Sequence, residues 1–144
     1  MTLYEKKILL WDLDGTLTDP ALGITNSVRH ALRAFGIEEP AREKLYPFIG
    51  PPLLDSFRQL YGFSEEEAVR AVAVYREYFA ETGIFENHVY PGIPELLRAL
   101  AEQGRVNVLA TSKPTVFARR ILEHFELTPY FTLTVGSNLD GTRA

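Results

Sequence analysis

Two aspartates near the N-terminus have the spacing that phosphoryl-transfer chemistry needs. They lie in the segment DLDGTLTD, residues 12–19, directly after the apolar run ILLW. Residues two apart in an extended segment point to the same side, so Asp12 and Asp14 can converge, and Gly15 lets the chain turn away. Two converging carboxylates form a strong site for a hard divalent cation such as Mg²⁺. One carboxylate can attack phosphorus to form an aspartyl phosphate, while the other exchanges protons with the leaving group and then with water.

Two other interpretations of this segment involve no phosphoryl chemistry. An acidic turn after a strand would use the same residues without any chemistry. A calcium-binding loop is excluded, because Gly15 comes too early and the later oxygen ligands are missing. An apolar strand that ends in DxDGT therefore favours a functional site.

A second candidate site is the segment Thr111-Ser112-Lys113-Pro114, which follows another apolar run. A hydroxyl, backbone amides and the N-terminus of a following helix together form an anion site. The alternative is an ordinary helix cap with proline in the first turn. Lys113 is the candidate cation that neutralises a bound phosphate. The alternative interpretation is that Lys113 is an ordinary solvated lysine near the start of the helix.

The apolar pattern predicts an α/β fold that brings these two segments together. Runs at residues 7–13, 106–110 and 131–135 have strand character, and the last alternates as a half-covered edge strand does. The first run is continuous, which predicts a strand buried on both faces. Helical patterns at residues 93–100 and 117–125 separate the strands, so we expect a parallel sheet. Ligands bind such sheets at the carboxyl ends of the strands, where both candidate segments lie.

The stretch between the first strand and residue 88 predicts a separate helical insert. Its apolar faces repeat at helical spacing and end at Gly36 and Gly62, and Ser64 with Glu67 forms a capping box for a third helix. We therefore expect residues 1–19 and 88–144 to form an incomplete Rossmann-like core. Residues 20–87 are expected to form an all-α cap that acts as a lid.

Composition narrows the class of protein. The 144 residues carry 15 basic and 19 acidic side chains, a net charge of −4, which gives no basic footprint for nucleic acid or an anionic membrane. There is no cysteine, so disulfides, thiolate metal sites and cysteine nucleophiles are excluded. The N-terminal apolar run is too short for a signal peptide, and no stretch is long enough to span a bilayer. We expect a cytoplasmic protein, a monomer or weak homodimer, whose partner is a small-molecule phosphate ester.

Three segments resemble the haloacid dehalogenase superfamily, and within it the phosphoglycolate-phosphatase-like group with a helical cap. They are DLDGTLTD, ATSKP at residues 110–114, and VYPGIPELLRAL at residues 89–100. The resemblance implies an Mg²⁺-dependent phosphomonoesterase that works through an aspartyl phosphate. Phosphoglycolate is the first substrate expectation, followed by a nucleoside monophosphate or another small phosphoester. A phosphosugar mutase on the same scaffold is the alternative.

The resemblance also implies roles for individual residues. Asp12 would be the nucleophile and a metal ligand, and Asp14 the general acid/base, with its backbone carbonyl on the metal. Thr111 would hydrogen-bond the transferring phosphoryl group, assisted by backbone amides near Asp14 and Ser112. We include Lys113 among the candidate catalytic residues, as the cation that would neutralise a bound phosphate.

Residues within and around these two segments are expected to have supporting roles. Gly15 and Thr16 are expected to help bind substrate, and Thr18 lies where the chain leaves for the cap. Gly50 and Pro51, in the segment FIGPP, resemble the substrate-specificity loop of the family. The alternative is a rigid Gly-Pro turn between cap helices, and the two interpretations remain open.

Two parts of the family's active site do not occur in this sequence. The family has a lysine after the third strand and an acidic pair after a fourth strand, which lies beside the first. We therefore expect this chain to be the N-terminal part of a longer protein, with a bare strand edge, and a catalytically incomplete fragment is the third functional interpretation. Asp19 and Asp140 are candidate outer-shell carboxylates, although each is more typical of an exposed turn. The histidines, His30, His88 and His124, show no metal-ligand spacing, and His124 is expected to be exposed.

Overall fold

The computed structural model describes residues 7–139, and the chain divides into two compact units. One unit combines the segment up to Asp19 with the segment from His88 onward, and the other spans Pro20–Asn87. All described strands belong to the first unit, whereas the second contains only helices. The chain therefore leaves the strand-bearing unit once, after Asp19, and returns to it once, at His88.

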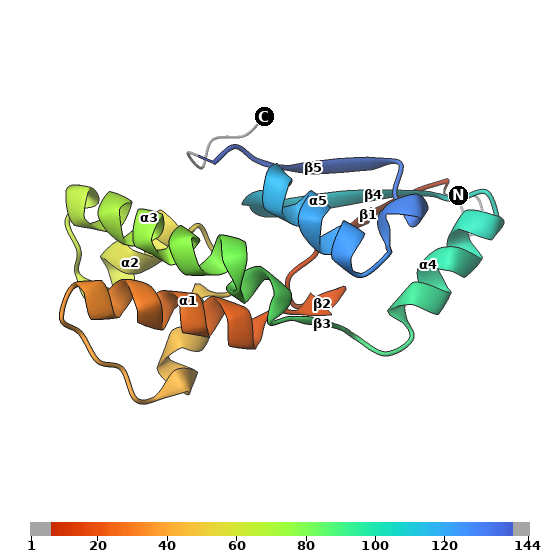
Figure 1. Ribbon diagram of the computed structural model, residues 1–144. Helices are drawn as coiled ribbons and strands as arrows, with labels where there is room; N and C mark the ends of the chain where they lie inside the picture. The colour runs from red at the N-terminus through yellow and green to blue at the C-terminus, as the bar shows by residue number, and fades with distance from the viewer. Residues whose placement is uncertain (1–6, 140–144) are drawn as a thin grey trace. The chain divides into compact units, whose positions relative to one another are not determined.

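A three-stranded parallel sheet forms the centre of the first unit (Figure 1). Its order is β1 (Ile8–Trp11), β4 (Val106–Pro114) and β5 (Leu133–Ser137). Helix α4 (Ile93–Glu102) precedes β4, and α5 (Thr115–His124) with the short η4 (Thr128–Tyr130) connects β4 to β5. Both long helices contact the sheet, burying Leu97, Leu109 and Ile121. The predicted α/β fold class, with its parallel three-stranded sheet, is confirmed.

The first strand is not buried on both faces as its continuous apolar run predicted. Ile8 is 62% exposed and Leu10 72% exposed. Within the described sheet β1 pairs with β4 alone, so it is an edge strand, and the side chains of Ile8 and Leu10 have no covering layer. β5 pairs with β4 alone in the described sheet, which confirms the predicted edge position. Its apolar side chains Leu133 and Val135 are exposed, so the covered side that the alternation predicted for them is wrong.

A second, two-stranded sheet was not predicted from the sequence. β2 (Thr18–Asp19) pairs antiparallel with β3 (His88–Val89), and each strand has only two residues, too few to show a periodic pattern. The Tyr90 backbone N–H also donates to the Leu17 carbonyl at 3.1 Å. This ribbon ties the end of the DLDGTLTD segment to the segment that leads into α4.

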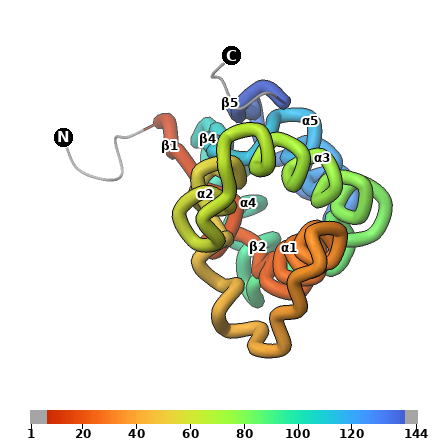
Figure 2. Tube along the Cα trace, turned by 90° about the vertical axis from the view of Figure 1, so that its left-hand side faces the viewer, coloured from red at the N-terminus to blue at the C-terminus, as the bar shows by residue number. Residues whose placement is uncertain are grey.

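The helical unit contains α1 (Ala21–Ala34), η2 (Arg42–Phe48), α2 (Leu53–Tyr61), α3 (Glu65–Glu81) and η3 (Gly83–Phe85). The predicted capping box is present, since Ser64 Oγ accepts from the Glu67 N–H at 3.1 Å and Glu67 Oε1 accepts from the Ser64 N–H at 2.9 Å. Helix α1 packs along α3 (Figure 2). Their apolar faces enclose a core. The buried apolar side chains include Ile24, Val28, Leu32, Phe57, Ala71 and Phe79.

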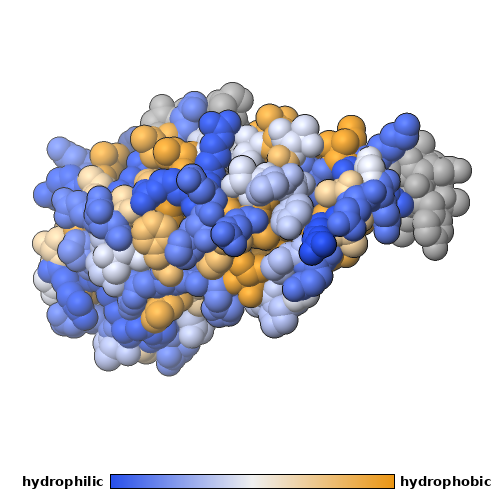
Figure 3. Space-filling view, turned by 45° about the vertical axis from the view of Figure 1, so that its right-hand side comes forward, coloured by the Kyte–Doolittle hydropathy of each residue, from blue (hydrophilic) through white to orange (hydrophobic). Residues whose placement is uncertain are grey.

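The surface of the described residues mixes hydrophilic and hydrophobic side chains. Figure 3 shows apolar residues interspersed with hydrophilic ones on one face of the molecule. Over residues 7–139, no helix combines the length and the apolar character that crossing a membrane requires.

Candidate active site

Parallel pairing of β1 with β4 brings the two candidate segments to the same edge of the sheet. The register aligns Ile8 with Val106 and Trp11 with Leu109. Asp12 therefore follows the end of β1 beside the part of β4 that leads into Thr111. The arrangement agrees with the rule that open α/β sheets bind ligands at the carboxyl ends of their strands.

A tight turn directly after Asp14 shapes the first segment. The Leu13 carbonyl accepts three backbone N–H groups, from Thr16 at 3.2 Å, Leu17 at 2.9 Å and Thr18 at 3.2 Å, and the Gly15 N–H donates to the Thr18 carbonyl at 2.8 Å. Gly15 has φ of +80°, a conformation that favours glycine. Leu13 and Leu17 are fully buried and anchor the turn. The exposed Asp12 and the more buried Asp14 flank the buried Leu13, as alternation along an extended segment requires.

A buried ion pair joins the two segments. Lys113 Nζ lies 3.3 Å from Asp14 Oδ2, and the two side chains are only 8% and 10% exposed. Lys113 is therefore not the solvated lysine that its place near a helix start suggests. Charges that are withdrawn from water interact more strongly than surface pairs do, so this contact orients both side chains.

The other oxygen of Asp14 has no hydrogen-bond partner among the described residues. Asp14 Oδ1 is buried and unpaired, and the same is true of Thr18 Oγ1 in the same turn. A buried carboxylate oxygen without a donor is costly unless a cation or a ligand satisfies it. Asp12 uses one oxygen, Oδ1, to accept from the Leu13 N–H at 2.8 Å.

The oxygens of Asp12 and Asp14 are of the type that could hold a magnesium ion. Mg²⁺ is commonly held by one or two carboxylates, with water and substrate phosphate filling its other positions. Within residues 7–139, no group of three or more acidic, histidine or cysteine side chains is placed to hold a metal. The fit therefore rests on two carboxylates, one of which has an orphaned buried oxygen.

The second segment projects from an irregular stretch of β4. Thr111 is buried and its Oγ1 accepts from the Lys113 N–H at 3.1 Å, while Ser112 is exposed. β4 was predicted to end at Ala110, but it extends to Pro114, because Pro114 pairs with Ser137 after a break in the ladder. Helix α5 then begins at Thr115, so the segment precedes a helix N-terminus as expected.

Other residues singled out in the sequence lie in the turn, in the helical unit, on β2 or outside the described range. Thr16 is exposed in the turn, and Gly50 and Pro51 are exposed between η2 and α2 in the helical unit. Asp19 lies on β2, where its Oδ2 is 3.6 Å from His88 Nε2, and Asp140 lies outside the described residues.

The histidines make surface contacts. His30 Nε2 is 3.7 Å from Glu77 Oε2. His124 is exposed, as predicted, with its ring centroid 4.9 Å from that of Phe125.

Two residues that the sequence did not single out form hydrogen bonds in or beside the strands that carry the site segments. Asn107 is 1% exposed, and its Oδ1 accepts from Trp11 Nε1 at 2.9 Å, while its Nδ2 donates to the Tyr130 carbonyl at 3.2 Å. Ser137 Oγ donates to the Ser112 carbonyl at 3.0 Å. A lone asparagine within the apolar run VNVLA is a detectable signal, whereas Ser137 has no distinctive pattern around it.

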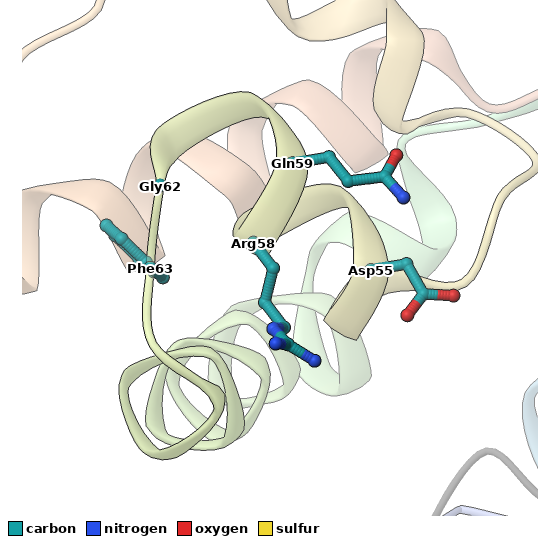
Figure 4. A pocket seen from close by; sticks show the side chains of 5 residues that line it. All are labelled: Asp55, Arg58, Gln59, Gly62 and Phe63. Carbon is teal, nitrogen blue, oxygen red and sulfur yellow. The ribbon is translucent and has the colours of Figure 1, made fainter.

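A hollow in the helical unit contains none of the predicted site residues. Its volume is about 420 Å³, and it is formed around the C-terminal end of α2 (Figure 4). Its lining is Asp55, Arg58, Gln59, Gly62 and Phe63. The Phe63 ring stacks on Phe57 at 5.8 Å between centroids, so this aromatic side chain is part of the helical core.

Comparison with known proteins identifies the same family that the site segments resemble. Residues 9–140 match the haloacid dehalogenase-like hydrolase family. A 5′-nucleotidase of Pseudomonas aeruginosa is 56% identical over 135 residues, which cover 94% of this chain and 61% of that protein. Tyrosine-protein kinase PtkA of Mycobacterium tuberculosis is 39% identical over 138 residues, which cover 95% of this chain and 46% of that protein. A phosphoglycolate phosphatase of Aquifex aeolicus is 30% identical over 145 residues, which cover 95% of this chain and 63% of that protein.

Solved structures agree with this relationship. The crystal structure of a predicted phosphatase from Clostridium acetobutylicum superposes with a TM-score of 0.91 at 52% identity, covering 94% of this chain and 63% of that one. The chain thus spans less than two thirds of the length of these relatives. The match over nearly all of the chain, together with the DLDGTLTD turn at the end of β1, shows that the chain belongs to the haloacid dehalogenase-like hydrolase family.

Proposed function

We propose that the protein hydrolyses small phosphomonoesters, with Asp12 as the nucleophile. The observation that carries this proposal is the buried ion pair between Asp14 and Lys113 at the carboxyl ends of adjacent strands. It couples the DxDGT turn to the segment TSKP, so that two carboxylates, a lysine and a threonine hydroxyl are available to one phosphoryl group.

The proposed chemistry divides the labour between the two aspartates. A carboxylate oxygen of Asp12 attacks phosphorus, and the bond from phosphorus to the ester oxygen breaks. Asp14 gives a proton to that leaving oxygen and later takes one from the water that cleaves the aspartyl phosphate. The products are an alcohol and inorganic phosphate, and Asp12 is regenerated.

The second segment would stabilise the transferring group. Thr111 Oγ1 already accepts from the Lys113 N–H, so its own O–H can donate to a phosphoryl oxygen. The ammonium group of Lys113 adds positive charge beside Asp14. Fixed donors and charges of this kind act where charge develops in the transition state.

The two aspartates would also hold Mg²⁺. Asp12 would offer its exposed carboxylate and Asp14 its backbone carbonyl, so that the unsatisfied Asp14 Oδ1 can carry the transferred proton. When bound, the ion would offset the repulsion between the carboxylates and the phosphate. Residues 20–87 are proposed to act as a cap that limits access of water, and Gly50 and Pro51 to contribute to specificity.

The names of the relatives point to two substrate classes. The 56% identical relative is a 5′-nucleotidase, and a 30% identical one is a phosphoglycolate phosphatase. Nucleoside 5′-monophosphates and phosphoglycolate are therefore the first substrates to compare. The cytoplasmic location expected from composition stays a prediction.

The decisive experiment replaces the nucleophile. In the presence of Mg²⁺, Asp12→Asn should lower phosphate release from these substrates on the order of 10⁴-fold or more, because an amide cannot form the covalent intermediate. Glu102→Gln is the control, since Glu102 is an exposed acidic residue of α4 that pairs with Arg98. Native-like turnover by the Asp12→Asn variant would refute the proposal.

A second candidate function is transfer of the phosphoryl group to an acceptor other than water. A phosphosugar mutase would transfer it to a sugar hydroxyl, and the 39% identical relative is a tyrosine-protein kinase. The same aspartyl phosphate would serve both reactions, and the outcome would depend on how well water is excluded. Comparing free phosphate with phosphorylated acceptor among the products separates the two functions.

A further inference from the structure

The segment Thr111–Lys113 is an insertion in the ladder between β4 and β5. The strands pair at Ala110 with Val135 and again at Pro114 with Ser137. Three residues of β4 therefore oppose a single residue of β5, Gly136. Bulges of this kind bend the strand and re-aim side chains, and they are common beside active sites.

At the bulge, the end of β5 adds side-chain hydrogen bonds to the backbone pairing of the two strands. Ser137, which is 8% exposed, donates from Oγ to the Ser112 carbonyl at 3.0 Å. Thr115 Oγ1 donates in return to the Ser137 carbonyl at 3.4 Å. These two hydrogen bonds add to the backbone pairing of Pro114 with Ser137 after the bulge.

Gly136 makes this close contact possible. A Cβ atom at that position would lie 2.5 Å from the Lys113 carbonyl oxygen and 2.9 Å from the Thr115 nitrogen. Both neighbours are backbone atoms, which cannot move aside as a flexible side chain can. The end of β5 therefore packs directly on the backbone of the phosphate-binding segment.

We propose that Ser137 is a positioning residue for this segment. Its hydroxyl holds the Ser112 carbonyl and so sets the plane of the peptide between Ser112 and Lys113. That plane directs the Lys113 N–H to Thr111 Oγ1 at 3.1 Å. It also helps to orient the Lys113 side chain toward Asp14. The inference rests on the proposed phosphatase function, because it assigns Thr111 and Lys113 to the phosphoryl group.

The test uses Ser137→Ala and a matched control, Thr134→Val. Thr134 lies on the same strand, opposite Leu109 and before the bulge. Two readouts are measured on the 144-residue chain: the ¹H–¹⁵N resonance of the Lys113 amide, and the affinity for inorganic phosphate in the presence of Mg²⁺. The thermal midpoint is recorded for each variant, so that loss of folding is separated from loss of positioning.

We expect Ser137→Ala to shift the Lys113 amide resonance and to weaken phosphate binding about tenfold, as for a lost buried hydrogen bond. Thr134→Val should leave both unchanged, and Ser137→Thr, which keeps the hydroxyl, should restore binding. An unmoved Lys113 resonance in folded Ser137→Ala would overturn the inference, and so would unchanged phosphate binding. If the native chain binds no phosphate, the proposed function fails instead, and the amide resonance still decides the positioning role.

Discussion

At the scale of single residues, the buried contact between Asp14 and Lys113 is the feature with the clearest energetic consequence. Removing two charges from water is expensive, and their attraction offsets that cost only while both are present. The pair is therefore a weak source of stability but a strong constraint on geometry. Its position suits a site in which the lysine and the carboxylate must face the same ligand.

Lys113→Met should destabilise the chain by about 3 kcal/mol, because it leaves the Asp14 carboxylate buried without its partner. Equilibrium urea unfolding measures the change. The double variant Asp14→Asn with Lys113→Met should recover part of the loss, since no buried charge remains. Lys44→Met, at an exposed position of η2, is the control and should change stability little. Equal effects of Lys113→Met and Lys44→Met would contradict the burial of this pair.

At the scale of elements, the last residue of α2 ties that helix to the segment that follows α1. Tyr61 donates from its hydroxyl to Glu39 Oε1 at 3.1 Å. Burial, and then the hydrogen bond and negative charge of Glu39, raise the pKa of Tyr61 to about 12 from 10.0. The folded state therefore holds this proton more tightly than the unfolded state does.

This raised pKa predicts a loss of stability at alkaline pH. Its contribution is fully present below pH 10 and is lost as the pH rises through about 12, because the unfolded chain releases the proton first. Tyr61→Phe should therefore make the free energy of unfolding fall less steeply between these values. Urea unfolding at a series of pH values measures the slope, with Tyr46→Phe, at an exposed position of η2, as control. An unchanged slope in Tyr61→Phe would exclude this residue as a source of the alkaline loss.

At the scale of the whole molecule, one face of the parallel sheet has no covering layer among the described residues. Its exposed apolar side chains include Ile8 and Leu10 on β1 and Leu133 and Val135 on β5. Contiguous apolar surface and an open strand edge both favour association with another chain. The expected state of this 144-residue chain is therefore a monomer that forms a weak homodimer through this face.

Leu10→Lys should shift this equilibrium toward the monomer, because it places a charge within the apolar face. Sedimentation velocity over a range of concentrations measures the weight-average mass. Leu60→Lys is the control, since Leu60 is a similarly exposed apolar residue of α2 in the helical unit. If both variants associate as the native chain does, the sheet face is not the contact surface.

Periodicity in the sequence was enough to predict the main elements. The strands at residues 8–11 and 106–110, the helices closed by Gly36 and Gly62, and the Ser64 capping box follow from local patterns, which do not depend on distant neighbours. The two-residue strands β2 and β3 were missed because so short a segment has no period. The prediction that β1 is buried on both faces was wrong, because the number of strands and helices beside it is not a local property of the sequence.

The sequence by itself also determined which residues are chemically capable, since the DxDGT spacing and the TSKP segment are local features. Only the tertiary structure decided that Lys113 is buried against Asp14, and that Ser137 holds the segment from the far side of β4. The physical reason is that each of these contacts joins residues far apart in the chain. Their distances are set by strand register and by the bulge opposite Gly136, which no local pattern of residue types encodes.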